Sequence, residues 1–493
     1  MLHGGCEMMW AVSGAGRNYT FVLPARPDIH VEMLDGEKTM NGNSASTPKL
    51  KRVLGLGSLL VYGMIIMQVA APLPIFGLLE QRSNGHAVTT ILVAMVAMAI
   101  TAVSYGRMAR LYPAAGSAYT YVARTINPHL GFLTGWSMFL DYLIIPLISA
   151  IIIANATEEV VPVPFFVRSL VIVVAMTTLN LYGIRATIRA NAILLAVTSG
   201  AIVLFFAFAW RWLFANEGWS GLVSLHPVYN PATFRSWDVL AGISLAAMNY
   251  IGFDGLTTLA EDSVNPKRDM ILATVLIVIV TGVLSAVELY FLHQVMPAPD
   301  WNAMTDTARD NAYLAAMQTV GGRPLFMTFC IVMSASQFGS AFSVQVSAAR
   351  LLYGMGRDNV LPRAVFGYLS PRRGNPSWNI MFVGVAAFVG SVLIPFDVAC
   401  ALLTFGAFVG FMGVNASTVI SYYVRPPQGH RRSFGRDAAL PACGFLLCVL
   451  FWLSLSNLTK LVGGGWLLLG LVYCAFKTGG FRRRPLLFDF SED

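Results

Sequence analysis

Two aspartates stand inside otherwise apolar stretches of this 493-residue sequence, and they define the chemistry it could perform. Asp141 follows Gly135-Trp-Ser-Met-Phe-Leu, and Asp254 follows Ile-Gly-Phe253. A charge in the middle of a membrane helix costs about 3 kcal/mol, so each should face the interior of a helix bundle and have a purpose. The alternative for each is a protonated carboxyl bonded to a nearby carbonyl.

The residues around the two aspartates suit a positively charged organic ligand. Tyr142, Tyr250 and Phe253 are neighbours of the carboxyls, and aromatic faces attract ammonium ions. The pattern therefore favours a small amine as the ligand. A third carboxyl, Glu288, lies in the outer half of its apolar run, where a structural role and an entrance-lining role are equally compatible with its position.

Other sources of chemistry are missing from the sequence. It has no phosphate-binding loop of the Gly-x-x-x-x-Gly-Lys-Ser/Thr type, no clustered Cys/His spacing and no haem-attachment motif. Six single cysteines are expected to be packing residues. We therefore expect no enzyme activity, no catalytic residues, no cofactor and no metal, and transport energy would come from an ion or substrate gradient.

The composition is that of a polytopic membrane protein. Hydrophobic residues make up 56% of the chain and charged residues 12%, against about 25% charged in ordinary soluble domains. A bilayer core needs about 20 apolar residues per helix, and alternating patterns typical of membrane barrels do not occur. Nucleic-acid binding is not expected. Twelve apolar runs are expected to be helices: 56–79, 87–108, 130–154, 166–184, 192–214, 239–260, 271–293, 324–352, 380–394, 398–424, 440–455 and 461–476.

The basic residues assign an orientation to these runs. When the connections alternate, one side collects most of them, including Arg107, Arg110, Lys267 and Arg372. Basic residues concentrate in cytoplasmic loops, which predicts an even number of spans and both termini in the cytoplasm of a bacterial inner membrane. Between the seventh and eighth runs, residues 300–323 are polar; a solvated loop is the favoured interpretation and a short helix over the entrance the alternative.

Runs one and six share an interruption by glycine or proline. The first reads VYGMIIMQVAAPLP from Val61 to Pro74, and the sixth reads MNYIGFDGLTT from Met248 to Thr258. Interrupted helices at corresponding positions of two halves indicate a ligand site in the middle of the membrane. The sixth ends at Glu261 and Asp262, beside Lys267, where an inner gate and a solvated ion pair are both compatible with the sequence.

Several segments resemble the amino acid, polyamine and organocation transporter superfamily. SYGRMARLYPAAGSAYTY from Ser104 to Tyr121 is similar to the exit of its second span, and YIGFDGLTTLAED from Tyr250 to Asp262 to its sixth. INPHLGF from Ile126 and RLLYGMGRDNVLP from Arg350 resemble the bacterial putrescine importer branch. The resemblance covers about residues 50 to 480.

The resemblance implies an all-α fold of about twelve transmembrane helices, with a five-plus-five inverted repeat like that of the bacterial leucine transporter and two further helices. The implied division is a disordered tail at 1–52, repeats at 53–215 and 236–425, helices eleven and twelve at 438–478, and a cytoplasmic tail at 479–493. Met33 or Met40 is the expected biological start, which leaves open whether the preceding residues are translated.

The resemblance also assigns binding residues. The unwound part of span one would be Gly63 to Gln68, Asp141 and Tyr142 would face the ligand from span three, and Tyr250 to Asp254 from span six. The resulting substrate set is Gly63, Met67, Gln68, Asp141, Tyr142, Tyr250, Gly252, Phe253 and Asp254, with Phe253 and Glu261 as gates.

One departure from the family pattern bears on the substrate. Carriers of amino acids hold the substrate carboxylate on a Gly-x-Gly-like turn, whereas here Gly63 is followed by Met64 and Ile65. Side chains there weaken a carboxylate cradle, which favours a diamine such as putrescine, imported with protons. An amino acid permease or exchanger is the alternative, and a non-transporting receptor or a channel is the alternative from another class. The coupling ion (a proton rather than sodium is expected) and the oligomeric state are not fixed by the sequence.

Overall fold

The structure is a computed structural model that describes residues 11–14, 17–20, 55–112, 117–158, 160–182, 187–296, 300–357, 361–370 and 375–482. Contacts within the chain divide it into residues 1–49 and 50–493. In the first unit, strand β1 (Ala11–Gly14) pairs antiparallel with β2 (Arg17–Thr20), and Ala11 lies opposite Thr20. The remainder of the tail predicted to be disordered, including Met33 and Met40, lies outside the described residues.

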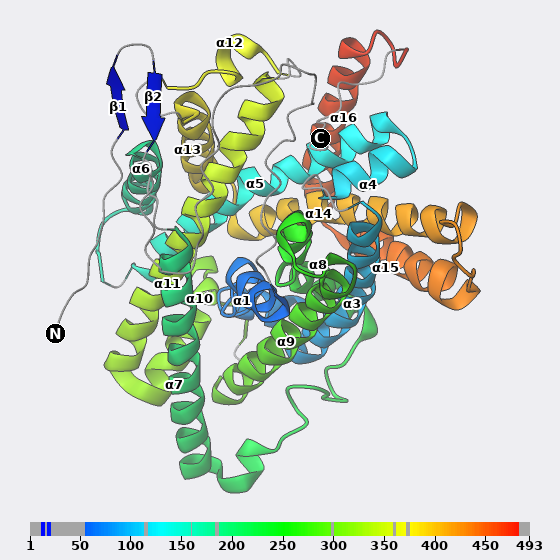
Figure 1. The fold of residues 1–493 in the computed structure, drawn as a ribbon. Helices are drawn as coiled ribbons and strands as arrows, with labels where there is room; N and C mark the ends of the chain where they lie inside the picture. The colour runs from blue at the N-terminus through cyan, green and yellow to red at the C-terminus, as the bar shows by residue number, and fades with distance from the viewer. Residues whose placement is uncertain are drawn as a thin grey trace, which may run out of the picture. The chain divides into compact units, whose positions relative to one another are not determined.

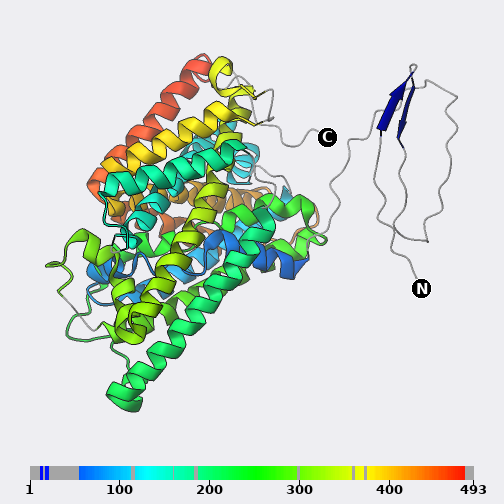
Figure 2. The same ribbon diagram turned by 90° about the vertical axis from the view of Figure 1, so that its left-hand side faces the viewer.

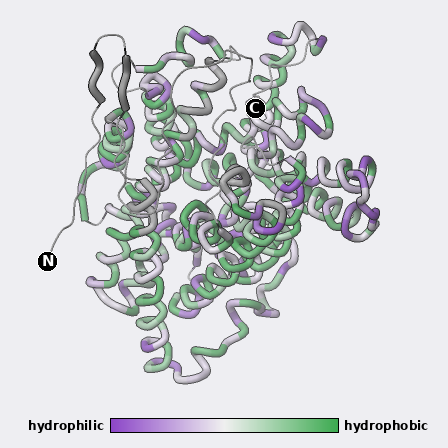
Figure 3. The backbone as a smooth tube through the Cα atoms, viewed as in Figure 1, coloured by the Kyte–Doolittle hydropathy of each residue, from purple (hydrophilic) through white to green (hydrophobic). Residues whose placement is uncertain are grey.

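The second unit is helical (Figure 1), and each predicted apolar run contains helix, with runs one and six each divided into two segments and the eighth helix beginning at Ala312. Hydrophobic residues dominate these helices in Figure 3. The helices are α1 (Leu56–Met67), α2 (Phe76–Ser83), α3 (Ala87–Leu111), α4 (Ser117–Thr125), α5 (Pro128–Ala156), α6 (Phe165–Tyr182), α7 (Thr187–Leu222), α8 (Ser236–Met248), α9 (Pro266–Val295), α10 (Asp306–Asp310), α11 (Ala312–Arg357), α12 (Arg363–Phe366), α13 (Ser377–Leu393), α14 (Phe396–Val419), α15 (Leu440–Ser454) and α16 (Asn457–Lys477), with a 3₁₀ helix η1 (Phe253–Asp262) and π-type turns η2 (Ile420–Val424) and η3 (Phe434–Ala439).

Within the described residues, eight helices are long and apolar enough to cross a membrane. Four shorter apolar helices accompany them: α1, α6, α8 and α13. Two of the short helices, α1 and α8, are the ones that belong to the interrupted runs one and six. The prediction of a helical membrane protein is therefore confirmed at this level.

Helix boundaries follow local sequence signals. Asn127 caps α5 by accepting a hydrogen bond from the N–H of His129, and Pro128 occupies the first helical position, where its missing N–H has no cost. Ser456 caps α16 in the same way through Thr459. These caps set the residues at which α5 and α16 begin.

Two features were not predicted from the sequence. The short helix α4 lies between α3 and α5 and packs against α5 and α14. Helix α7 continues beyond its apolar run to Leu222, with a kink at Gly218 (φ 64°), and its end projects from the bundle (Figure 2). There Trp219 contacts Trp210 edge to face at 6.3 Å.

The helices form two packing groups. The first helix group contains α1, α2, α3, α8, η1 and α9, and the second contains α5, α6, α11 and α13. Helix α14 packs against members of both, including α3, α8 and α5. We call the end of the helix bundle that carries Arg107 and Arg110 the basic side. The end that carries α10 is called the lid side, after the segment 300–311 that contains α10.

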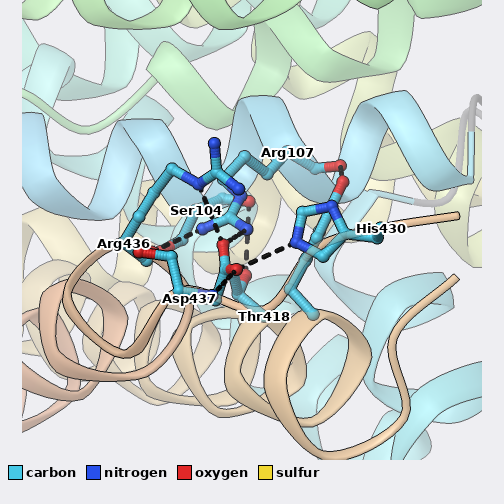
Figure 4. A network of polar contacts seen from close by, with 8 residues as sticks. Ser104, Arg107, Thr418, His430, Arg436 and Asp437 are labelled. Atoms are coloured by element: carbon cyan, nitrogen blue, oxygen red, sulfur yellow. Dashed lines mark hydrogen bonds and ion pairs between the residues drawn. The ribbon is translucent and has the colours of Figure 1, made fainter.

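A buried polar network ties α3 to the chain after α14 on the basic side (Figure 4). Arg107 contacts Asp437 with 2.5 Å between Nη2 and Oδ1, and its side chain stacks 3.9 Å above the ring of Tyr422. His430 and Arg436 also contact the Asp437 carboxylate, at 2.9 and 3.1 Å. Asp437 is fully buried, and its pairing with these basic side chains offsets the cost of removing its charge from water.

Replacement of Asp437 by alanine is expected to destabilise the protein by about 3–5 kcal/mol, because it leaves Arg107 buried without a counter-charge. The apparent midpoint of thermal unfolding in detergent would measure the loss. Asp306→Ala, which removes the exposed pair with Arg309, is the control and should cost about 1 kcal/mol or less. Equal midpoints for the two variants would contradict this account.

Candidate functional site

The first interrupted helix breaks between α1 and α2. Helix α1 ends at Met67, and Gln68 takes a positive φ of 54° before the chain turns through Ile75. Pro72 and Pro74 explain the break, because proline lacks an N–H and disfavours helical backbone in the residue before it. The predicted unwound segment, Gly63 to Gln68, is thus displaced: Gly63 to Met67 are helical, and the break is Gln68 to Ile75.

The second interrupted helix breaks between α8 and η1. Helix α8 ends at Met248, and Gly252 has φ 120°, a conformation that favours glycine. The carboxylate of Asp254 accepts a hydrogen bond from the N–H of Gly252 at 3.1 Å, and the N–H groups of Asp254 and Gly255 also bond to it. Asp254 therefore caps the half-helix that follows the break.

The two breaks lie against each other. A side chain at Gly252 would place its Cβ 2.7 Å from Cγ2 of Ile66 and 3.5 Å from Cγ of Met67. Glycine is needed at 252 for this close approach as well as for its φ angle. The predicted juxtaposition of the interruptions in runs one and six is present in the structure.

A cavity of about 80 Å³ lies beside the two breaks. It sits between the first break, α5, the end of α8, α11 and α14. Most of its surface is apolar, and four neutral polar side chains, those of Gln68, Ser149, Gln337 and Ser340, interrupt it. Its other lining residues are Ile66, Met67, Ala71, Pro74, Ile75, Ile145, Ile148, Ile152, Met248, Ile251 and Leu403.

Asp141 lies just beyond the basic-side end of this cavity. It is on α5, one turn from Ile145, and faces Gly406 of α14, where any Cβ would overlap its Oδ1 atom. That oxygen is buried and has no hydrogen-bond partner among the described residues. Asp141 and Asp254 lie near each other, and both lie near Tyr105 and Tyr142. The two aspartates thus share one acidic region beside the cavity.

A buried aromatic cluster closes the basic side of this region. Phe253 contacts Tyr105 of α3 and Phe411 of α14, each with 5.2 Å between ring centroids. Tyr105 also contacts Tyr121 of the unpredicted helix α4 at 6.3 Å. Phe253 is fully buried in this cluster.

Only Met67 and Gln68 of the nine predicted binding residues line the cavity, and three of the others, Gly63, Tyr142 and Tyr250, pack against neighbouring helices. The Tyr250 hydroxyl donates a hydrogen bond to the carbonyl of Ile91 at 2.8 Å, so this side chain points toward α3. Gly63 contacts Ile277 of α9. Tyr142 packs on the Phe139 cluster between α5 and α13. These residues lie in runs that are apolar on every side, so the direction of each side chain could not be predicted from the sequence.

The remaining predicted residues divide as follows. Met67 and Gln68 line the cavity, while Gly252, Phe253 and Asp254 form the second break. The side chain of Glu261 lies outside the described residues. Ser149 and Gln337 were missed, although a polar residue inside an apolar run was a usable signal; they contact each other at 3.2 Å across the cavity wall.

The polar region 300–323 contains the short helix α10 and the first turns of α11 in place of the favoured solvated loop, and Asp310 lies beside Pro74 and Ile152 of the cavity lining. Trp301 packs edge to face on Phe76 of α2 at 5.6 Å, and the backbone of Arg309 lies against Gly77. Asn155 at the end of α5 donates to Asp310 at 3.4 Å. The lid, residues 300–311, therefore contacts both helix groups.

The amino acid permease family matches residues 78–470 of the chain. The low-affinity putrescine importer PlaP of Escherichia coli (strain K12) is 30% identical over 89% of this chain and 96% of its own. The branched-chain amino acid permease BcaP of Lactococcus lactis is 24% identical over 90% of this chain and 96% of its own. The vacuolar cationic amino acid transporter 4 of Arabidopsis thaliana is 25% identical over 76% of this chain and 62% of its own.

The lid should make stability depend on pH through Asp310. Burial raises the pKa of this carboxyl to about 7, with Asp306 and Asp397 adding to the rise and Arg309 opposing it. The folded state therefore binds the proton more tightly than the unfolded chain, and the stabilisation is lost as pH rises from about 4 to about 7. Asp310→Asn should gain more than about 1 kcal/mol relative to wild type between pH 5 and pH 8.

Thermal unfolding of both proteins across this pH range would measure the difference. Asp300→Asn is the matched control, because it replaces an exposed carboxyl of the same lid. Parallel curves for wild type and Asp310→Asn would show that Asp310 does not hold a proton in the folded lid.

Proposed function

The chain belongs to the amino acid permease family, and we propose that this transporter imports a small cationic amine, best fitted by putrescine or a related diamine, in symport with protons. The observation that carries the proposal is the meeting of two broken helices beside a cavity that adjoins Asp141 and Asp254. Breaks of this kind expose backbone and half-helix ends to a ligand in the middle of the membrane.

The charges around the cavity favour a cation. Its lining residues include no arginine, lysine or histidine that would pair with a substrate carboxylate. The N–H groups at the start of η1 could hold an anion, but the Asp254 carboxylate already occupies them. An α-amino acid would have to displace this cap, whereas an ammonium ion is attracted by it.

The cavity lining suits a short methylene chain with polar ends. Methionine and isoleucine side chains form the apolar wall, and Gln68, Ser149, Gln337 and Ser340 provide oxygen acceptors. One ammonium would bond to these oxygens, and the other would approach Asp141 and Asp254. Tyr105 and Phe253 would present ring faces to it.

The architecture supports alternating access. The first helix group joins runs one, two, six and seven, and the second joins runs three, four, eight and nine, as a five-plus-five repeat in twelve spans would require. Rocking of one group against the other would open the cavity first to the lid side and then to the basic side. The basic side would be cytoplasmic, with both termini on it, in a bacterial inner membrane.

The proposal is tested by uptake of labelled putrescine into proteoliposomes containing the purified full-length protein. Asp141→Asn and Asp254→Asn should each reduce uptake at least about tenfold, the effect of losing about 1.4 kcal/mol of binding. Glu217→Gln, which changes an exposed carboxyl on α7, is the control and should leave uptake unchanged.

Competition identifies the substrate class. Diamines should compete with the label, and leucine and arginine should not. Undiminished uptake in both aspartate variants would reject the proposed roles of Asp141 and Asp254. Competition by α-amino acids without competition by diamines would reject the proposed substrate in favour of an amino acid permease.

A further inference from the structure

Glu288 on α9 is a buried carboxyl without a partner. It is 0% exposed and lies within the apolar stretch Arg268–Val295. Neither Oε1 nor Oε2 has a hydrogen-bond partner among the described residues, and no charged side chain in that part of the chain acts on it. Two other buried carboxyls are paired, Glu80 with His293 and Asp437 with Arg107, whereas the buried Asp141 also has an oxygen without a partner among the described residues.

The protonation of Glu288 in this state follows from its burial and its lack of a partner. An ionised carboxylate in an apolar interior is costly unless it is paired, so the group must be neutral, with a proton on one oxygen. Nearby ionisable side chains do not change this, because each is engaged elsewhere. His293 binds Glu80, the Tyr290 hydroxyl donates to Leu222, and the Tyr250 hydroxyl donates to Ile91.

The face of α9 that carries Glu288 leads to the second break. Thr281, Ser285 and Glu288 lie on one face, because residues three and four apart are neighbours on a helix. Asn249, the first residue of the break, donates from Nδ2 to Oγ of Ser285 at 2.9 Å. Its Oδ1 and the Thr281 hydroxyl are also buried without partners among the described residues. Ile251, two residues along from Asn249, lines the cavity.

We propose that Glu288 carries the coupled proton and that Ser285 and Asn249 transmit its protonation to the break. The proton would come from the lid side, forming the O–H bond of Glu288, and would leave to the basic side when that bond breaks. When Glu288 is ionised it needs donors, and the Ser285 hydroxyl lies one turn away and is bonded to the Asn249 amide, so ionisation would draw Ser285 toward Glu288 and change its contact with Asn249. The inference rests on the proposed proton symport.

A proton fits this site better than a metal cation does. Hard cations take several oxygen ligands around one point, whereas Thr281, Ser285 and Glu288 are spread over two turns of α9. A proton requires one oxygen atom. Accumulation driven by a sodium gradient instead of a pH gradient would overturn the assignment.

Glu288→Gln in the full-length protein tests the role, because glutamine has the shape of the neutral acid but cannot release a proton. In proteoliposomes held at zero membrane potential, one pH unit should drive about tenfold accumulation of labelled putrescine per coupled proton in wild type. The variant should show no accumulation and no putrescine-dependent proton flux, while counterflow at equal pH stays within about twofold of wild type.

Two further variants and an infrared measurement test whether the effect comes from the carboxyl group of Glu288. Glu288→Asp keeps the carboxyl and should keep proton flux, and Glu217→Gln should behave as wild type. The infrared carbonyl band of a protonated carboxyl at neutral pH should weaken in Glu288→Gln, a result that does not depend on the substrate. If wild type moves an amino acid and not putrescine, the function proposal fails, and the same comparison made with that amino acid still tests Glu288.

Retained accumulation and proton flux in Glu288→Gln would overturn the inference. A Glu288→Gln protein that does not fold, or that folds but loses counterflow, would also overturn it, because both outcomes indicate a structural role for the carboxyl.

Discussion

The structure depends on one constraint of the lipid environment: a backbone N–H or C=O that leaves a helix must find a partner inside the protein. Two helices are interrupted where they meet, and side chains at this contact fill space and satisfy backbone groups. Ile66 and Met67 fill the space left by Gly252, and the carboxylate of Asp254 satisfies N–H groups at the start of η1. The cavity lies beside this contact.

Most of the fold could be predicted, because apolar runs of helical length and Asn-Pro or proline signals act locally. The exact position of the first break was not predicted, since Gly63 is compatible with helix when a neighbour such as Ile277 packs on it, whereas Pro72 and Pro74 are not. Helix α4 was missed because it lies in a short polar connection where no apolar run marks it.

The sequence was sufficient to predict where the candidate site lies, but not which side chains line it. Asp141 and Asp254 were identifiable because charge is rare inside apolar runs, and the structure brings both to one region. Side-chain direction was not predictable: Tyr250 turns toward Ile91, while Ser149 and Gln337 turn into the cavity. On a helix that is apolar on every side, only packing with its neighbours decides which residue faces the ligand.

The lid links the broken helix to the rest of the bundle. It rests on Phe76 and Gly77 of α2, in the first helix group, and on Asn155 of α5, in the second. Because the lid also continues directly into α11, separation of the groups on that face must break the lid's contacts either with α2 or with α5. In the proposed transport cycle, the strength of these few contacts would therefore set how readily the cavity is exposed to solvent on that face, so substitutions far from the ligand could alter uptake.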